Sequence, residues 1–145
     1  MEYRIARKDD LLGLLSLYKQ LNPEEEIIDL EKAYWVWDAT EKTNATRYFV
    51  AVDTTRIVST CNITLVPNLT RHGKPFAIIE NVITDNDYRR RGIGKKVIEN
   101  AVQYAKENNC YKVVLLSSMR RIESHEFYES IGFNGSSKKG FEIRF

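Results

Sequence analysis

Apolar residues recur along this 145-residue chain with a helical period at first. The first helical face collects Leu11, Leu14, Leu15 and Tyr18. This i, i+3, i+4, i+7 spacing predicts an amphipathic helix that Asp9 or Asp10 could cap. Residues 3–6 ahead of it are typical of a short strand, and Asn22 with Pro23 ends the helix because proline cannot continue one.

A second helix is predicted after this break, because three glutamates at positions 24–26 suit the positive N-terminal end of a helix. Its apolar stripe would be Ile27, Leu30, Tyr34 and Trp37. From Arg47 onwards the period changes to two, which predicts antiparallel strands over residues 47–52 and 57–67 with a turn at 53–55. A third strand, over residues 75–84, follows a turn at 71–74.

A glycine-containing loop then leads into a helix over residues 93–108. Its buried face would be Val97 or Ile98, Ala101, Val102 and Ala105. The continuous apolar run at 111–116 is typical of a strand covered on both faces. A last helix at 122–131 is ended by Gly132, and strands around Phe133 and over 141–145 close the chain. This order predicts one mixed α/β domain spanning residues 1–145.

The composition of the chain restricts the kinds of binding partner that are expected. The chain is 43% hydrophobic and 29% charged, as expected of a globular protein, and its formal net charge of +2 calls for neither a nucleic-acid nor a membrane partner. Cys61 and Cys110 are the only cysteines and form no CxxC pair, which disfavours a disulfide framework or a metal site. Without a signal-like apolar stretch at the N-terminus, we expect a cytoplasmic location.

The loop at residues 87–96 reads DYRRRGIGKK and is followed directly by the amphipathic helix. A helix N-terminus with open N–H groups, glycine and neighbouring cations predicts a site for a multiply charged anion. The spacing is wrong for a nucleoside-triphosphate P-loop, since Gly94 and Lys95 are followed by Lys96 where Ser or Thr is required. A dinucleotide-binding loop would need a third glycine where Val97 stands.

The pattern that remains is R-x-x-G-x-G, formed by Arg89, Gly92 and Gly94 between a strand and a helix. It resembles the coenzyme A pyrophosphate loop of the GNAT superfamily of acetyl-CoA-dependent N-acetyltransferases. The stretch HEFYESIGF at residues 125–133 is similar to the FYxxxGF signature of the same superfamily. The two motifs follow each other in the order and separation typical of its members.

The resemblance implies an α/β fold with a mixed sheet of six to seven strands and about four helices. It also implies that the sheet splays between the strand before the glycine loop and the next strand, where acetyl-CoA would bind as co-substrate, with no metal. The residues it assigns to coenzyme binding are Val82, Thr84, Arg89, Arg90, Arg91, Gly92, Ile93, Gly94, Lys95 and Ser124. The main chain of the first two would meet the pantetheine arm, and the loop N–H groups would hold the pyrophosphate.

For catalysis the resemblance assigns Tyr128 as the general acid that protonates the coenzyme A sulfur. Packing alone is the alternative role of this side chain. Glu80 is the candidate general base, directly or through a water, unless it is an outward-facing strand residue or an ion-pair partner. Neither His72 nor His125 is expected to catalyse, and direct transfer requires no cysteine nucleophile.

One departure concerns the pantetheine region. Many members have an asparagine seven residues before the tyrosine, where this chain has Arg121. Ser124 stands where a small residue such as alanine is common, and Ser117 or Ser118 could replace the missing contact. Arg121 could instead reach a phosphate.

The expected acceptor is the primary amine of a small molecule. Residues 79–82 and 109–113 are similar to glucosamine-6-phosphate N-acetyltransferases, which makes an amino-sugar phosphate one candidate. Acidic and aromatic side chains within residues 20–37 suit a cationic amine instead. A non-catalytic coenzyme A-binding module and a nucleic-acid binder using the arginines at 89–91 stay open as other classes, and family analogy also leaves open a homodimer.

Overall fold

The computed structural model describes all residues from 1 to 145 and contains four helices and five strands. The helices are α1 (Leu11–Leu21), α2 (Leu30–Thr43), α3 (Ile93–Glu107) and α4 (Ile122–Ile131). The strands are β1 (Glu2–Ile5), β2 (Thr46–Asp53), β3 (Arg56–Val66), β4 (Phe76–Thr84) and β5 (Val113–Leu115). The chain divides into two compact units, Met1–Val114 and Leu115–Phe145, which are described separately.

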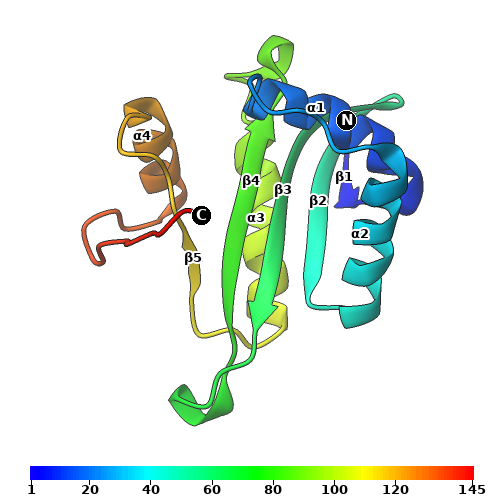
Figure 1. Ribbon diagram of the computed structural model, residues 1–145. Coiled ribbons are helices and arrows are strands. Elements are labelled where there is room, and N and C mark those ends of the chain that lie inside the picture. Colours follow the sequence, from blue (N-terminus) through cyan, green and yellow to red (C-terminus); the bar gives the residue numbers. More distant parts are fainter. The chain divides into compact units, whose positions relative to one another are not determined.

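The strands form one sheet in the order β1-β2-β3-β4-β5. The pairs β1–β2, β2–β3 and β3–β4 are antiparallel, as the period of two predicts. The chain then crosses over through α3 and returns beside the start of β4, where the Tyr111 amide donates to the Pro75 carbonyl and the Ala77 amide to the Lys112 carbonyl. From the first of these hydrogen bonds to the second, the residue numbers rise in both segments. β5 therefore runs parallel to β4 (Figure 1).

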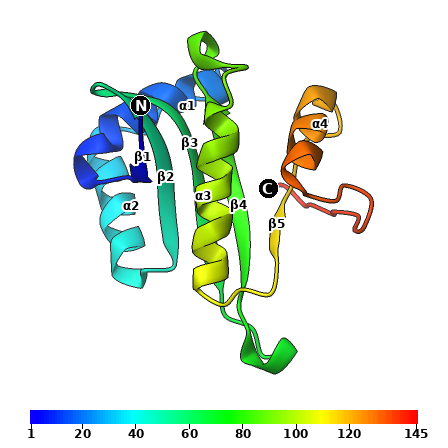
Figure 2. The ribbon, with the colours of Figure 1, turned by 180° about the vertical axis from the view of Figure 1, so that it is seen from behind.

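Helices cover both faces of the sheet in the first unit. On one face, apolar residues of α1 and α2 pack on those of β2, β3 and β4. This cluster comprises Ala6, Leu11, Leu14, Leu17, Ala33, Trp37, Val50, Val52, Ile57 and Ile83. On the other face lies α3, where the ring of Tyr104 is 5.7 Å from that of Phe49, the neighbour of Val50 on β2. Figure 2 shows α3 in front of the sheet.

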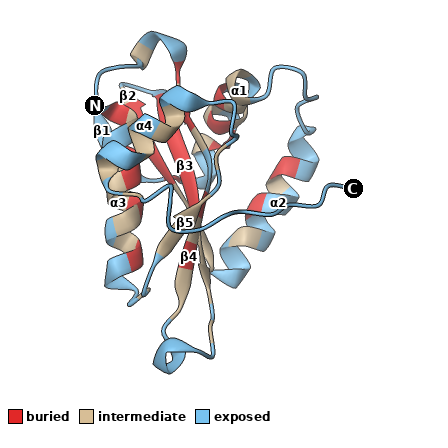
Figure 3. Cartoon of the chain, turned by 90° about the vertical axis from the view of Figure 1, so that its left-hand side faces the viewer, coloured by how far each residue is buried: buried red, intermediate tan, exposed pale blue.

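The buried face of α3 is close to the predicted one. Ile93, Val97, Ile98, Ala101 and Ala105 are buried, and the expected Val102 is only half-buried because it lies at the edge of this face. Burial is also continuous along seven positions of β3, as Figure 3 shows, because this central strand is covered on both sides. The strand expected to be covered on both faces was instead the one at residues 111–116, and there β5 is only three half-buried residues long.

The start of the second helix differs from the prediction. Residues 24–28 are not helical, and α2 begins at Leu30, where the Asp29 side chain accepts a hydrogen bond of 2.9 Å from the Lys32 amide. An aspartate side chain that caps the backbone defines a helix start more strongly than charge near the dipole alone. The three glutamates consequently belong to the loop between α1 and α2.

The end of the chain also differs. A strand was expected around Phe133, but this residue follows α4, where its amide donates 3.1 Å to the Tyr128 carbonyl and closes the helix at Gly132. Residues 141–145 alternate apolar and polar side chains, yet their backbone forms no ladder. A segment with alternating apolar and polar side chains forms a strand only where another strand pairs with it. The sheet therefore has five strands where six to seven were expected, and the mixed α/β class is confirmed.

Candidate active site

A bulge interrupts β4 at the predicted general base. Thr60 pairs with Ile83 and Asn62 with Glu80, so two steps along β3 correspond to three along β4. The extra residue lies at Asn81, whose φ of 52° places it in the left-handed region. Its side-chain amide donates 2.9 Å to the Asn62 amide oxygen, which holds the bulge from the neighbouring strand.

The bulge changes which groups of β4 are available. Glu80 and Asn81 are both exposed, although consecutive residues of a regular strand face opposite sides. Val82 has no partner in the β3 register and is half-buried. Thr84 pairs with Ser59 instead, and its carbonyl accepts 3.2 Å from the Arg89 guanidinium.

The glycine loop ends at the N-cap of α3. Gly92 holds that position with a φ of 75° and carries no capping side chain, so the first N–H groups of the helix, those of Ile93, Gly94 and Lys95, have no intrahelical acceptor. No atom lies within 4 Å of a Cβ built on Gly92, so the backbone conformation, not crowding, requires glycine. Ile93 is 5% exposed and anchors the helix start in the core.

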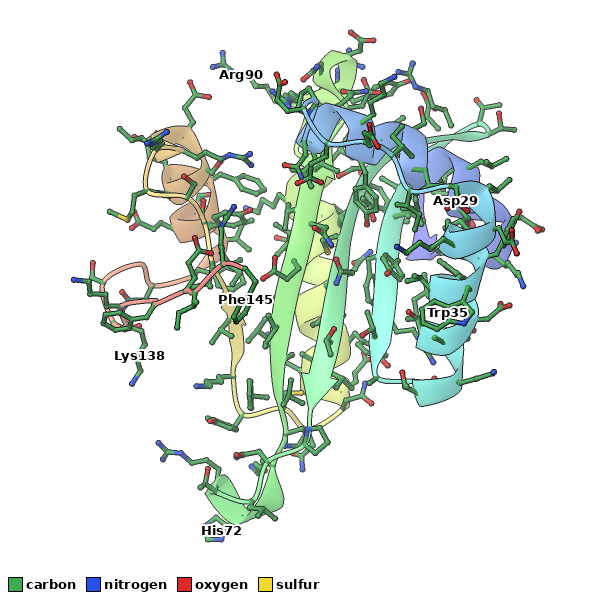
Figure 4. All side chains as sticks on the ribbon, viewed as in Figure 1. Asp29, Trp35, His72, Arg90, Lys138 and Phe145 are labelled. Atoms are coloured by element: carbon green, nitrogen blue, oxygen red, sulfur yellow. The ribbon has the colours of Figure 1, made fainter.

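Four cations surround this helix start without an ion-pair partner: Arg89, Arg90, Arg91 and Lys95. The Arg90 backbone is left-handed with a φ of 60°, which is strained for a residue with a Cβ. Its side chain extends away from the loop into solvent in Figure 4. Open N–H groups and unpaired cations together are what a pyrophosphate requires, so these residues fit the coenzyme expected from the sequence.

Asp85 connects this loop to the rest of the unit, a role that sequence reasoning missed. It is 3% exposed, and its carboxylate accepts hydrogen bonds from Arg56 at 2.6 Å, Gln20 at 3.0 Å and the Asp87 amide at 3.0 Å. Burial by itself would raise the pKa of Asp85, but these hydrogen bonds and the Arg56 charge lower it below its ordinary value. The carboxylate is therefore ionised and neutralised by Arg56 instead of repelling an anion at the loop.

Tyr88 provides a second set of contacts that hold the same loop. Its hydroxyl donates 2.8 Å to Asp53, and the guanidinium groups of Arg56 and Arg91 lie 5.6 Å and 5.2 Å from its ring centre. The hydrogen bond to Asp53 is the main reason why the pKa of the Tyr88 phenol is raised. The turn between β2 and β3 thus supports the loop that carries the cations.

A cavity of about 160 Å³ lies between α1, the loop that follows it and the β4 bulge. Its lining residues are Leu15, Tyr18, Lys19, Leu21, Asn22, Glu25, Glu26, Ile27, Ile28 and Asn81. Asn81 therefore belongs to both the bulge and the cavity wall, and Glu80 is its neighbour in the chain. The cavity wall thus includes part of the 20–37 region, whose acidic side chains Glu25 and Glu26 it contains.

The second unit carries the tyrosine motif on α4. The ring of Tyr128 lies 5.3 Å from that of Phe127 and 6.2 Å from that of Phe133. Arg121 is the residue before α4, and its carbonyl accepts 3.0 Å from the Ser124 amide. The His125 ring bonds to the Ser118 carbonyl at 2.8 Å, a contact that ties the preceding loop to the helix.

The structure thus groups most predicted site residues on one β4–loop–α3 segment of the first unit, and places Tyr128 and Ser124 on α4 of the second. The predicted turn residue His72 lies at the other end of β4 from Arg90 (Figure 4). No helix of the structure is both long and apolar enough to cross a membrane.

Comparisons with known proteins agree with the family resemblance found in the sequence. The sequence model of the acetyltransferase (GNAT) family matches residues 14–133. Glucosamine 6-phosphate N-acetyltransferase of Trypanosoma brucei brucei is 30% identical over 140 residues, covering 96% of this chain and 92% of that protein. A putative acetyltransferase from Agrobacterium tumefaciens str. C58 is similar in structure, with a TM-score of 0.95, 41% identity and full coverage of both chains. Glucosamine-6-phosphate N-acetyltransferase from Arabidopsis thaliana has a TM-score of 0.85 and 25% identity, over 98% of this chain and 97% of that one.

Proposed function

The chain belongs to the acetyltransferase (GNAT) family and is an acetyl-CoA-dependent N-acetyltransferase, and we propose that it transfers the acetyl group directly to the primary amine of a small molecule. The observation that carries this proposal is the continuous segment from the β4 bulge to the start of α3. Along this stretch, the exposed Glu80 carboxylate and the bulge at Asn81 are followed by the start of α3, whose first N–H groups have no intrahelical acceptor.

The coenzyme would be held mainly by backbone groups. The N–H groups from Arg90 through Lys95 would bind its pyrophosphate at the positive end of α3, with side-chain charges adding hydrogen bonds. The main chain of Val82, which has no partner in the β3 register, would pair with the pantetheine arm. Thr84 would contribute less, since its carbonyl already accepts from Arg89. Ser124 would contact the coenzyme from α4.

Proton transfer through two residues is then required of the protein. An amine attacks the thioester carbonyl only when it is neutral, and Glu80 would take the ammonium proton directly or through a water. Glu80 makes no ion pair and is exposed beside the bulge, which supports this role over a structural one. Tyr128 would give its phenolic proton to the departing coenzyme A sulfur and would recover a proton from the acylated nitrogen, which loses its second proton as the amide forms.

The two units would act as one catalytic domain. The family match at residues 14–133 includes most of α1, all of α2 and α3 in the first unit, and α4 in the second, which supports a single domain. Within this domain we assign no role to nucleic acid or to a membrane. A cytoplasmic location and a homodimer remain predictions for fractionation and sedimentation measurements.

An amino-sugar phosphate is the second candidate acceptor. It is favoured by the relative from Trypanosoma brucei brucei, which is named as a glucosamine 6-phosphate N-acetyltransferase. Arg120 and Arg121 would then be the phosphate partners, since neither forms an ion pair within the protein.

The proposal is tested by titrating acetyl-CoA calorimetrically and then measuring thiol release with a panel of amines. We expect saturable binding of acetyl-CoA and amine-dependent release of coenzyme A. Binding without release for every amine class would favour a non-catalytic coenzyme A-binding module. Absence of binding would overturn the proposal.

A further inference from the structure

We propose that the cavity beside the β4 bulge binds a small cationic primary amine with an apolar body and no phosphate group. The inference rests on the proposed function, because it names the acceptor class of that same site. It also chooses between the two acceptor candidates that sequence similarity and composition leave open.

Half of the residues that line the cavity are aliphatic or aromatic. Leu15 and Leu21 come from α1, Ile27 and Ile28 from the loop after it, and the ring of Tyr18 completes this surface. Burial raises the pKa of the Tyr18 phenol, so this side chain carries no charge at neutral pH. A hydrocarbon body gains free energy on such walls, about 25 cal/mol per Å² removed from water, whereas the hydroxyl groups of a sugar would lose hydrogen bonds to water there.

The charges of the cavity are unbalanced in favour of a cation. Glu25 and Glu26 line it, and neither carboxylate forms an ion pair with a basic side chain. Lys19 is the one basic side chain in the lining, which leaves a formal net charge of −1. A phosphate would meet two unpaired carboxylates, whereas an ammonium group would be attracted to them.

The bulge supplies a polar anchor at the end of the cavity. The Asn81 side chain donates its amide hydrogen to Asn62, which leaves its amide oxygen to accept a hydrogen bond from an amine. The adjacent residue is Glu80, the proposed base. An amine bound by Asn81 would therefore lie beside the residue that is proposed to take its proton.

The experiment compares acceptors in the full-length enzyme with acetyl-CoA saturating. The amines are 2-phenylethylamine, isopentylamine, glucosamine and glucosamine 6-phosphate, and kcat/KM is measured for each by thiol release. We expect the first two to exceed glucosamine 6-phosphate by at least tenfold. Glucosamine separates the effect of the phosphate from that of the sugar ring.

Two variants test the role of the carboxylates. In the double variant E25Q/E26Q, KM for 2-phenylethylamine and isopentylamine should rise about fivefold, which is the loss of affinity expected when exposed charge pairs are removed. KM for acetyl-CoA should stay unchanged. The matched control is E24Q, which removes a neighbouring glutamate that does not line the cavity and should change neither constant.

The outcomes separate this inference from the function on which it rests. Glucosamine 6-phosphate as the best acceptor, or an unchanged amine KM in E25Q/E26Q, would overturn the inference while leaving an active N-acetyltransferase. Absence of acetyl-CoA binding in the unmodified enzyme would instead overturn the proposed function. Circular dichroism of both variants confirms that any change in KM does not come from unfolding.

Discussion

At the scale of single residues, Asp85 shows how a buried charge can hold the loop before α3 in place. Its carboxylate joins Gln20 of α1, Arg56 of β3 and the backbone of the loop. Because the acid is neutralised locally, it can lie next to the coenzyme loop without repelling phosphate. The loop geometry consequently depends on residues far away in the sequence.

Replacing Asp85 by Asn removes the ion pair and weakens three hydrogen bonds. We expect a loss of about 1–3 kcal/mol in the free energy of unfolding at pH 7, measured by urea denaturation. D87N is the control, because that carboxylate is exposed and lies 4.0 Å from Arg56. An equal loss in both variants would contradict the role of Asp85.

The same residue predicts a pH dependence. The pKa of Asp85 is lower in the folded protein than in the unfolded chain, so its stabilising contribution is complete above the unfolded value of about 4 and is lost as pH falls through the folded value. The free energy of unfolding of D85N should therefore fall less steeply below pH 4 than that of the unmodified protein. Parallel curves for the two proteins would contradict this assignment.

The proposed general acid is tested by Y128F. The variant keeps the aromatic packing against Phe127 and Phe133 and removes only the hydroxyl. We expect kcat to fall about 10²-fold or more while KM for acetyl-CoA stays within a factor of two. An unchanged kcat would show that Tyr128 packs without donating a proton.

At the scale of elements, the start of α3 combines a helix dipole with free cations. Backbone N–H groups at a helix N-terminus keep their direction, whereas exposed arginine and lysine side chains adapt to the ligand. The backbone should therefore provide most of the geometry and the side chains most of the salt dependence.

Charge removal at this helix start should weaken coenzyme binding in a salt-dependent way. In R90A/K95A we expect the Kd of acetyl-CoA to rise about tenfold at low salt, with a smaller difference in 0.5 M NaCl, measured by calorimetry. R144A is the matched control, because this arginine lies outside the loop and pairs with Glu142. A salt-independent loss in R90A/K95A would indicate a structural defect instead.

Elements also show where sequence reasoning succeeds. Gly92 and the apolar face of the helix that follows it predict α3, because a helix start and a helical period both depend on residues close together in the sequence. The start of α2 is harder, since glutamates at 24–26 and Asp29 are both acceptable near a helix start and only capping geometry separates them. The C-terminal alternation at 141–145 predicts a strand, but pairing depends on a partner that local pattern does not contain.

At the scale of the whole molecule, the candidate site could be predicted in part. The glycine loop and the tyrosine motif are each one continuous stretch of sequence, so the resemblance to the GNAT superfamily is enough to predict both. The Asp85 network was missed because Gln20 and Arg56 lie 65 and 29 positions away from the residue they bind. The cavity likewise joins α1 to a bulge 60 or more residues later, which only the folded chain brings together.

The two cysteines, Cys61 buried and Cys110 half-buried, bear on the mechanism. Burial raises the pKa of the Cys61 thiol to about 12 and also raises the pKa of Cys110. Neither thiol is then a thiolate at neutral pH, so a covalent acetyl-enzyme is disfavoured. This agrees with the proposed direct transfer of the acetyl group to the amine.

One measurement tests this claim most directly. The enzyme is mixed with acetyl-CoA and 2-phenylethylamine, and mass spectrometry follows both the small molecules and the intact protein during turnover. We predict N-acetylated amine and free coenzyme A in equal amounts, with the mass of the protein unchanged throughout. An acetylated protein that forms and decays at the rate of turnover, or coenzyme A released without an N-acetylated product, would contradict direct acetyl transfer to an amine.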